Sequence, residues 1–212
     1  MTISASAIIL AGGKSSRMGL PKATLPFGRA TIIERLIAEL GGAFAQVIVV
    51  AAPAADELFS IDHLLAAWPH AELVRDAVAY AGPAVALGRG LAHARGEIAF
   101  ACSCDLPLLN AGVARALCAM IGSHDAVMPE VDGRLQPLHA VYRRAPCSAA
   151  LAAMTAGDER RLGAIADRID VRRVTAIEMR RLDPDLLSLL NVNTAEDYAR
   201  ALRLLRMSPA PR

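Results

Sequence analysis

Residues 7–22 read AIILAGGKSSRMGLPK, and this stretch decides the fold of the chain. The apolar run at its start predicts a buried strand over residues 5–11. A segment with three glycines, two lysines and an arginine follows directly. Glycines let backbone N–H groups approach an anion closely, and the cations neutralise its charge. The stretch therefore predicts an α/β protein with a phosphate-binding turn after its first strand.

Two familiar phosphate-binding motifs do not fit this turn. A P-loop ending in Gly13-Lys14-Ser15 would need a glycine where Ile8 stands, and no G-x-G-x-x-G is present. Lys14 and Lys22 are the only lysines of a chain that otherwise uses arginine. An ordinary strand-to-helix turn is the alternative, but it gives no reason for this concentration of cations.

Composition limits the class of protein. A chain of 212 residues suits one domain, expected over residues 1–206 with a frayed tail at 207–212. With 54% hydrophobic but only 4% aromatic residues, its core must be aliphatic. A formal net charge of +2 argues against a nucleic-acid binder.

Targeting signals are not evident in the sequence. No run of apolar residues is long enough to span a membrane, and the N-terminus lacks the basic region of a signal peptide. We therefore expect a cytoplasmic protein with no membrane partner. Its four cysteines form no C-x-x-C pair, so buried free thiols are expected.

Apolar runs and helical patterns alternate along the rest of the chain, which predicts a mostly parallel sheet with helices on both faces. Further strands are expected at residues 47–50, 72–75, 97–102, 126–129, 138–143 and 171–177. Helices are expected after Thr31 up to Gly41, at 56–67, from Pro83 to about residue 95, after Asn110 through Ile121, at 145–166 with a break near Gly157, and from Thr194 to about residue 206.

An aspartate ends the predicted central strand. Asp105 follows the buried run at residues 98–104, and Pro107 prevents the strand from continuing. The carboxyl edge of an open α/β sheet is where ligands bind. A carboxylate at that edge suits Mg²⁺, although a capping or ion-paired aspartate would look the same. Asn191 and Asn193 lie two apart, so both could face one site. A cap of the last helix by Asn193 or Thr194 is the alternative, and it is compatible with the site role.

The pattern L-A-G-G-x-S-x-R-M-G-x-x-K resembles the nucleotide loop of the molybdenum cofactor guanylyltransferases and related nucleotidyltransferases. The resemblance extends from Ile8 to Asp197 and implies a three-layer Rossmann-like fold. It implies nucleotide contacts from Leu10, Ala11, Gly12 and Gly13, and catalytic contacts to the phosphates from Arg17 and Lys22.

Three later segments resemble the same family. Cys-Asp-Leu-Pro at residues 104–107 resembles its C-D-x-P segment, which implies that Asp105 binds Mg²⁺ and acts in catalysis. Asn191-Val192-Asn193-Thr194 resembles the N-x-N-T segment that closes the site, which implies a metal role for both asparagines. The resemblance also implies a nucleotide contact from Asp76, which precedes Gly82-Pro83. The alternative is that Asp76 only forms a turn.

The implied reaction transfers GMP from MgGTP to the terminal phosphate of molybdopterin and releases pyrophosphate. The glycine turn Ala11-Gly12-Gly13 and the segment 133–142 resemble the corresponding segments of family members that use GTP rather than CTP. Ala86 replaces the second glycine of their G-P-L-A-G segment. After the second strand, the family's nucleotide-binding asparagine appears here as Ala51 or Ala52. Within the second segment, His139 is the histidine expected near the acceptor.

Several alternatives stay open on the sequence. They are a CTP-dependent cytidylyltransferase for the same cofactor, an enzyme with another phosphorylated acceptor, and an inactive nucleotide-binding module. Because Lys22 and Asp105 are both present, the inactive module is the least favoured. The expected partners are the small-molecule substrates GTP and molybdopterin, together with maturation proteins of molybdenum enzymes. We do not expect the chain to bind nucleic acid.

Overall fold

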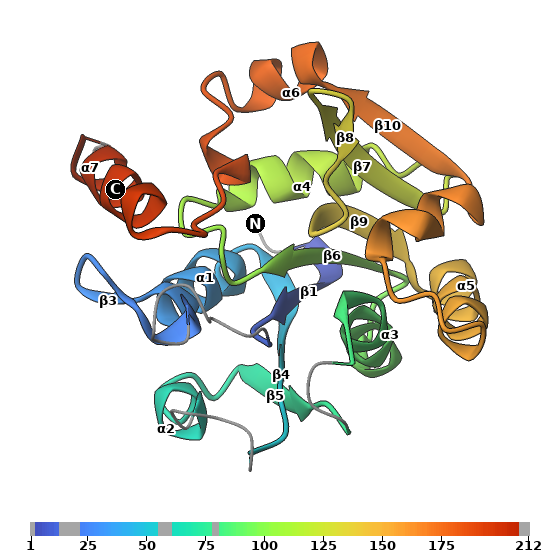
Figure 1. Cartoon of the computed structure of the whole chain (residues 1–212), viewed down its shortest axis with the longest axis horizontal. Helices are drawn as coiled ribbons and strands as arrows, with labels where there is room; N and C mark the ends of the chain where they lie inside the picture. Colours follow the sequence, from blue (N-terminus) through green and yellow to red (C-terminus); the bar gives the residue numbers. More distant parts are fainter. Residues whose placement is uncertain (1–2, 13–21, 55–60, 78–80, 208–212) are drawn as a thin grey trace.

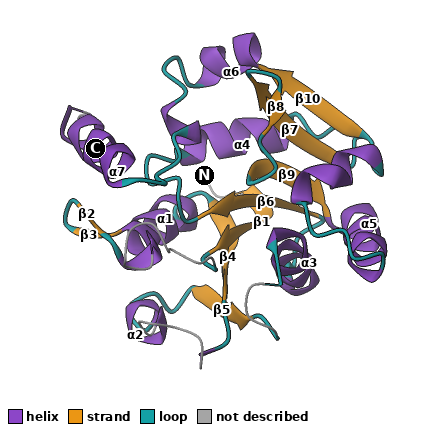
Figure 2. Cartoon of the chain, viewed as in Figure 1, coloured by secondary structure: helices purple, strands orange, loops and turns teal. Residues whose placement is uncertain are grey.

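Strands and helices alternate along the chain and build one twisted sheet covered on both faces (Figures 1 and 2). The computed structural model describes residues 3–12, 22–54, 61–77 and 81–207. The main sheet contains β1 (Ile3–Leu10), β4 (Phe44–Ala51), β5 (Ala71–Arg75), β6 (Ile98–Ser103), β7 (Ala126–Val131), β8 (Arg134–Leu135), β9 (His139–Arg143) and β10 (Val171–Thr175). A small hairpin pairs β2 (Pro26–Phe27) with β3 (Ala30–Thr31).

The strand order is β10-β7-β9-β6-β1-β4-β5, with β8 paired to β7. The first strand lies between β4 and β6, parallel to both, and β5 extends the parallel half. On the other side β9 runs antiparallel to β6 and β7, while β10 is parallel to β7. The predicted fold class, a mostly parallel sheet between helical layers, is confirmed.

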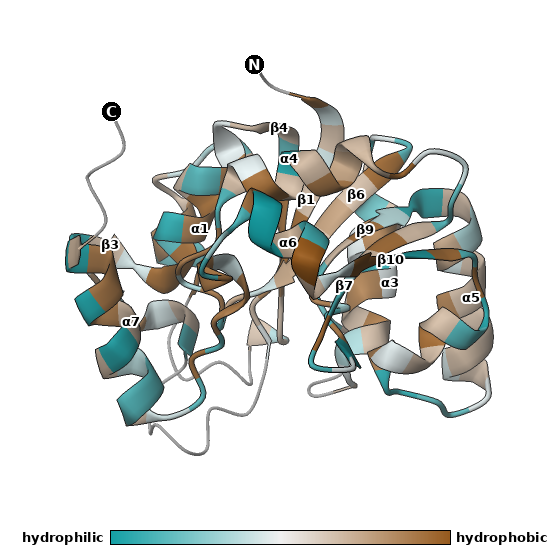
Figure 3. Cartoon of the chain, turned by 90° about the horizontal axis from the view of Figure 1, so that it is seen from above, coloured by the Kyte–Doolittle hydropathy of each residue, from teal (hydrophilic) through white to brown (hydrophobic). Residues whose placement is uncertain are grey.

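Helices cover the two faces of this sheet unequally. They are α1 (Ile32–Gly41), α2 (Ile61–Leu65), α3 (Pro83–His93), α4 (Ala111–Ala119), α5 (Arg144–Ala156), α6 (Ala176–Leu182) and α7 (Ala195–Met207), with short 3₁₀ turns η1 (Lys22–Thr24), η3 (Leu162–Asp167) and η4 (Leu187–Leu189). Buried residues of α1, α2, α4, α6 and α7 share one core cluster. Those of α3 and α5 share the other, and Figure 3 shows α7 and α5 at opposite ends of the molecule.

Alternation along the strands supplies both cores. In β1, Ile9 faces the α1 side and Ile8 the α3 side, and both are fully buried. Side chains two apart share a face of a strand, so each strand contributes to both layers. Each fully buried aliphatic side chain stabilises the fold by about 1.5–3 kcal/mol. The cores are largely aliphatic, as the composition predicts.

Local signals place most helix ends correctly. Thr31 caps α1 through a capping box with Glu34, Pro83 stands in the first turn of α3, and the Asn110 side chain accepts hydrogen bonds at the start of α4. The predicted helix over 145–166 ends at Ala156, and the 3₁₀ turn η3 follows the cap at Gly157. Likewise α4 stops at Ala119, before the Ile121 that the prediction included.

One predicted element is wrong in part. The strand expected over residues 171–177 ends at Thr175, and Ile177 belongs to α6, where its side chain is 71% exposed. The reason is a second capping box, in which the Thr175 side chain accepts from Glu178 N and the Glu178 carboxylate accepts from Thr175 N. In the sequence, the apolar pair Ala176-Ile177 favours a continued strand and outweighs the capping box.

All four cysteines are buried free thiols, as predicted. Burial raises the pKa of Cys104 to about 12, so this thiol stays protonated. In the part of the chain that the structure describes, no helix combines the length and apolarity needed to cross a membrane.

Thr175→Ala should lower the free energy of unfolding by about 1 kcal/mol, because it removes the side-chain cap of α6. Urea denaturation of the variant and the wild type measures this difference. Hydrogen bonds from the Thr175 backbone and side chain lower the pKa of Glu178 from 4.5 to about 2. Its stabilising contribution is therefore present above pH 4.5 and is lost as the pH falls towards 2.

The difference between wild type and variant should accordingly shrink over that acid range. Thr155→Ala is a matched control, because its hydroxyl donates within α5 and caps nothing. An equal loss of stability in both variants would contradict the role of the Thr175 cap.

Candidate active site

The parallel strands of the sheet end together at one edge. Leu10, the last residue of β1, is in register with Val50 of β4 and Ser103 of β6. The backbone that follows each strand stays tied to its neighbour, as Ala11 N donates to Val50 O and Cys104 N to Leu10 O. This edge therefore collects the loops after β1, β4, β5 and β6, which is the usual ligand position in such sheets.

Three predicted site residues meet at this edge. Lys22 Nζ donates to Asn193 Oδ1 at 2.7 Å and lies 3.6 Å from Asp105 Oδ2. The Lys22 and Asp105 side chains are 19% and 23% exposed, so a ligand can still reach them. An ammonium, a carboxylate and an amide oxygen are thus held together from three distant parts of the chain.

The loop after β6 holds Asp105 on two sides. The Ser103 hydroxyl donates to Asp105 Oδ1, and Asp105 O accepts from Val192 N at 2.8 Å. Through the second bond, the C-terminal segment that carries Asn193 is anchored to the end of β6. Ser103 was not among the site residues predicted from the sequence. It lies two residues before Asp105 at the end of a strand, and this spacing could have indicated that both side chains lie at the same edge of the sheet.

The two asparagines play different parts. Asn193 points to Lys22, whereas Asn191 donates from Nδ2 to Leu189 O at 3.1 Å and lines a neighbouring pocket. Val192 between them is completely buried. Asp197 Oδ2 accepts from Asn193 N and Thr194 N, and these bonds lower its pKa. The predicted Thr194 start of α7 is confirmed, and it also orients the Asn193 backbone.

The turn after β1 is partly described. Leu10 is buried and Ala11 half-buried, and a Cβ added to Gly12 would lie 3.8 Å from Ala52 N, an ordinary contact. Packing against the described residues thus gives no reason for a glycine at position 12. The predicted contacts of Gly13 and Arg17 lie outside the described residues.

Asp76 follows β5 at the same edge and is nearly buried. Its backbone N donates to Ala51 O, and its side chain is 10% exposed. Burial raises the pKa of its carboxyl group, while Arg89 Nε at 3.9 Å from Oδ1 opposes the rise. Oδ1 has no hydrogen-bond partner among the described residues. A buried acceptor without a donor costs stability, so this atom is suited to a ligand's N–H or O–H group.

A polar pocket of about 570 Å³ adjoins the cluster on the β7 side. One wall is the hairpin from β7 to β8, whose turn residues Asp132 and Gly133 both have positive φ. The other wall is the segment between α6 and α7 together with the first turns of α7. The side chains that line the pocket are Val131, Asp132, Arg134, Gln136, Asp185, Leu186, Leu189, Leu190, Asn191, Asp197 and Arg200. Arg134 belongs to the segment 133–142 that the sequence marks, whereas Arg200 carries no pattern that marks it.

Similarity to known proteins agrees with this geometry. Residues 7–172 match the family described as MobA-like NTP transferase domain. A "Probable molybdenum cofactor guanylyltransferase" of Methanosarcina mazei is 35% identical over 198 residues, covering 91% of this chain and 87% of that protein. A protein of the same name from Mycobacterium tuberculosis is 35% identical over 200 residues, covering 92% and 91%.

A solved structure shares the fold. The molybdopterin-guanine dinucleotide biosynthesis protein A from Archaeoglobus fulgidus superposes with a TM-score of 0.80 at 22% identity. The superposition covers 96% of this chain and 100% of that one.

Proposed function

Because the chain belongs to the MobA-like NTP transferase family, we propose that it transfers GMP from GTP to the terminal phosphate of molybdopterin. The meeting of Lys22, Asp105 and Asn193 at the carboxyl edge of the sheet carries this proposal. The printed names of the curated relatives support guanine and molybdenum cofactor. So do the turn Ala11-Gly12-Gly13 and the segment 133–142.

Two binding regions flank the cluster. The nucleotide is assigned to the β1, β4 and β5 side, which carries Leu10, Ala11 and Gly12 and the Asp76 Oδ1 atom, an acceptor without a hydrogen-bond partner among the described residues. Gly13, which lies outside the described residues, is assigned to the same contact on the sequence. The acceptor is assigned to the opposite side, where the polar pocket opens beside Asn191. The reacting phosphates would then meet at Lys22 and Asp105, between the two regions.

The reaction needs no strong general base. An anionic oxygen of the acceptor phosphate forms a bond to the α-phosphorus of GTP, and the bond from that phosphorus to the β-phosphate oxygen breaks. Pyrophosphate leaves with the bonding electrons. The chain's task is therefore to orient the two phosphates and to neutralise their charge. We assign that task to the Lys22 ammonium and, in the loop before it, to Arg17.

The donor set fits a magnesium ion that is shared with the substrate. No group of three or more His, Cys, Asp or Glu side chains suited to a metal occurs among the described residues. Mg²⁺ is commonly held by one or two carboxylates together with substrate phosphates. Asp105 would hold it here, assisted by the amide oxygen of Asn193. Asn191, the other amide predicted as a ligand, would have to turn from Leu189 O to join them. Bound there, Mg²⁺ would supply countercharge to the triphosphate.

Binding and turnover together test the proposal. Purified protein is titrated with GTP, CTP and ATP, with and without Mg²⁺, and pyrophosphate release is then measured after addition of molybdopterin. We expect Mg²⁺-dependent preference for GTP and pyrophosphate release that requires molybdopterin. Preference for CTP would assign the chain to the cytidylyltransferases and give weight to Ala86. GTP binding without release would redirect the search to another phosphorylated acceptor.

A further inference from the structure

His139 is a polar side chain buried in the core of the sheet. It is 1% exposed, and among the described residues neither ring nitrogen has a hydrogen-bond partner. Burial lowers its pKa to about 4, so the imidazole is neutral and carries one N–H donor and one acceptor. Two unsatisfied polar atoms in a core are costly and call for an explanation.

The described residues around the ring pack against it but form no hydrogen bond with it. His139 pairs with Cys102 across β9 and β6, and its ring meets Phe100 edge-on, with centroids 5.2 Å apart at 89°. Asp183 is the acidic group whose charge acts on the imidazole. The Asp183 carboxylate accepts instead from Ser188 N at 2.8 Å and Ser188 Oγ at 2.5 Å.

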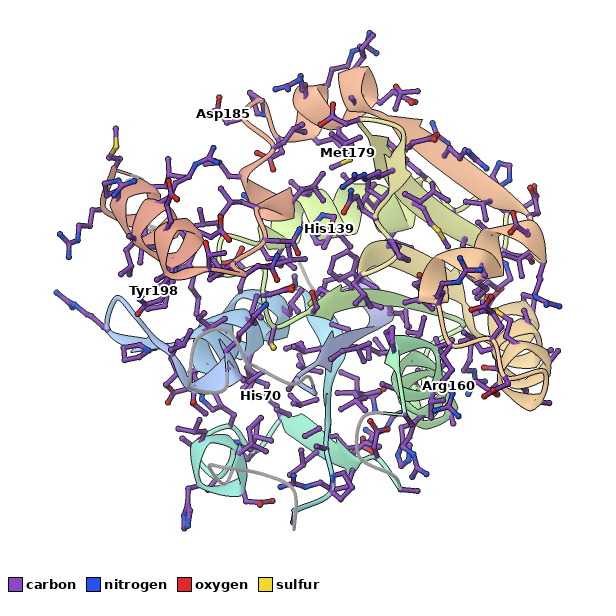
Figure 4. The ribbon with its side chains drawn as sticks, in the orientation of Figure 1. His70, His139, Arg160, Met179, Asp185 and Tyr198 are labelled. Carbon is purple, nitrogen blue, oxygen red and sulfur yellow. The ribbon has the colours of Figure 1, made fainter. Side chains whose placement is uncertain are left out.

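Residues 183–193, the segment from the end of α6 to the N-x-N-T motif, lie over this part of the core. Its leucines pack against the same cluster as Phe100. Figure 4 places His139 between β6 and Met179 of α6, with Asp185 further out. Within this segment Leu186 has φ +53°, a left-handed conformation that is unfavourable for leucine. Backbone strain of this kind often marks a segment with a functional rearrangement.

The same segment serves the pocket and the catalytic cluster. Leu186, Leu189 and Asn191 line the pocket, and Gln136, whose O accepts from His139 N, lines it from the other wall. At its end, Val192 and Asn193 bind Asp105 and Lys22. A shift of residues 183–193 would therefore change the depth of the pocket and the geometry of the cluster together.

We infer that His139 is an acceptor-binding residue, reached when residues 183–193 move outward and deepen the pocket as the acceptor enters. This inference rests on the proposed function for the identity of the acceptor. A neutral imidazole can give and take one hydrogen bond each, so it suits an uncharged heterocyclic edge with both a donor and an acceptor. It does not suit an anion, which Arg134 and Arg200 of the same pocket would bind better.

His139→Phe is the sharpest test, because phenylalanine keeps an aromatic ring against Phe100 and removes both unpaired atoms. We expect an unfolding temperature at least as high as that of the wild type, since the variant buries no unsatisfied group. The Kd for GTP, measured without molybdopterin, should stay unchanged. The KM for molybdopterin should rise about tenfold, the loss expected for one or two hydrogen bonds.

Two further variants complete the design. His139→Gln retains a donor and an acceptor and should recover part of the molybdopterin affinity. His70→Phe makes the same exchange next to Trp68, just before the edge strand β5, and should leave both substrates unaffected. Amide hydrogen exchange should show residues 183–193 changing protection when molybdopterin is added to wild type but not to His139→Phe.

The outcomes separate the two proposals. Transfer by the wild type decides the proposed function, whereas the ratio of variant to wild-type KM decides the role of His139. An unchanged molybdopterin KM in a stable His139→Phe protein would overturn the inference and leave a purely structural histidine. A marked fall in unfolding temperature would also overturn it, because it would mean that the imidazole is satisfied within the core.

Discussion

Lys22→Ala should lower kcat/KM for guanylyl transfer by about two to three orders of magnitude, the usual cost of removing one preorganised electrostatic donor. Lys22 is the cation that the structure places against both Asp105 and Asn193. It has the flexible ammonium that can follow a phosphate through the reaction. Steady-state measurement of pyrophosphate release at varied GTP gives the effect.

The fold should survive this change. The Lys22–Asp105 ion pair is partly exposed and its atoms are 3.6 Å apart, so its loss should cost only about 1 kcal/mol, and the unfolding temperature of Lys22→Ala should stay close to that of the wild type. Arg203→Ala, which removes an exposed cation from α7, is the matched control and should leave activity intact. Lys22→Arg should recover only part of the rate, because a guanidinium is larger and planar. Near-normal turnover by Lys22→Ala would refute the site.

Much of this site could be predicted because its signals are local or follow from topology. Parallel strands end at one edge, so placing Asp105 directly after a buried strand was enough to put it near the turn after β1. Lys22 and Asn193 are 171 residues apart, yet each follows a short motif with a defined position in the fold. The caps at Thr31, Asn110 and Thr194 depend on neighbouring residues alone and were equally predictable.

Other features depend on packing between distant segments. His139 lacks a hydrogen-bond partner among the described residues because β9, β6 and residues 183–193 enclose it. The pocket likewise requires the hairpin turn at Asp132 to face the segment that carries Leu186. Neither arrangement has a periodicity or spacing that a single sequence displays. The start of α6 was mispredicted for a different reason. Its Thr175–Glu178 capping box is present in the sequence, but the apolar residues beside it favoured a strand.

Asp105→Asn should abolish measurable transfer, with a loss of about a thousandfold or more. Asparagine has the size of aspartate but lacks the negative charge, so the change removes the proposed Mg²⁺ ligand and the partner of Lys22 with little effect on packing. GTP affinity in the wild type should increase on addition of Mg²⁺. In Asp105→Asn this increase should disappear, which isothermal titration with and without the ion measures directly.

The matched control is Asp170→Asn, which neutralises an exposed carboxylate beside His124 at the far edge of the sheet and should change neither quantity. The backbone of Asp105 makes the result interpretable, because its carbonyl accepts from Val192 N whatever the side chain is. The Asn193–Lys22 contact should therefore persist in the variant, and lost turnover can be attributed to the missing carboxylate. If Asp105→Asn kept the Mg²⁺-dependent gain in GTP affinity, the metal would have to be held by other residues.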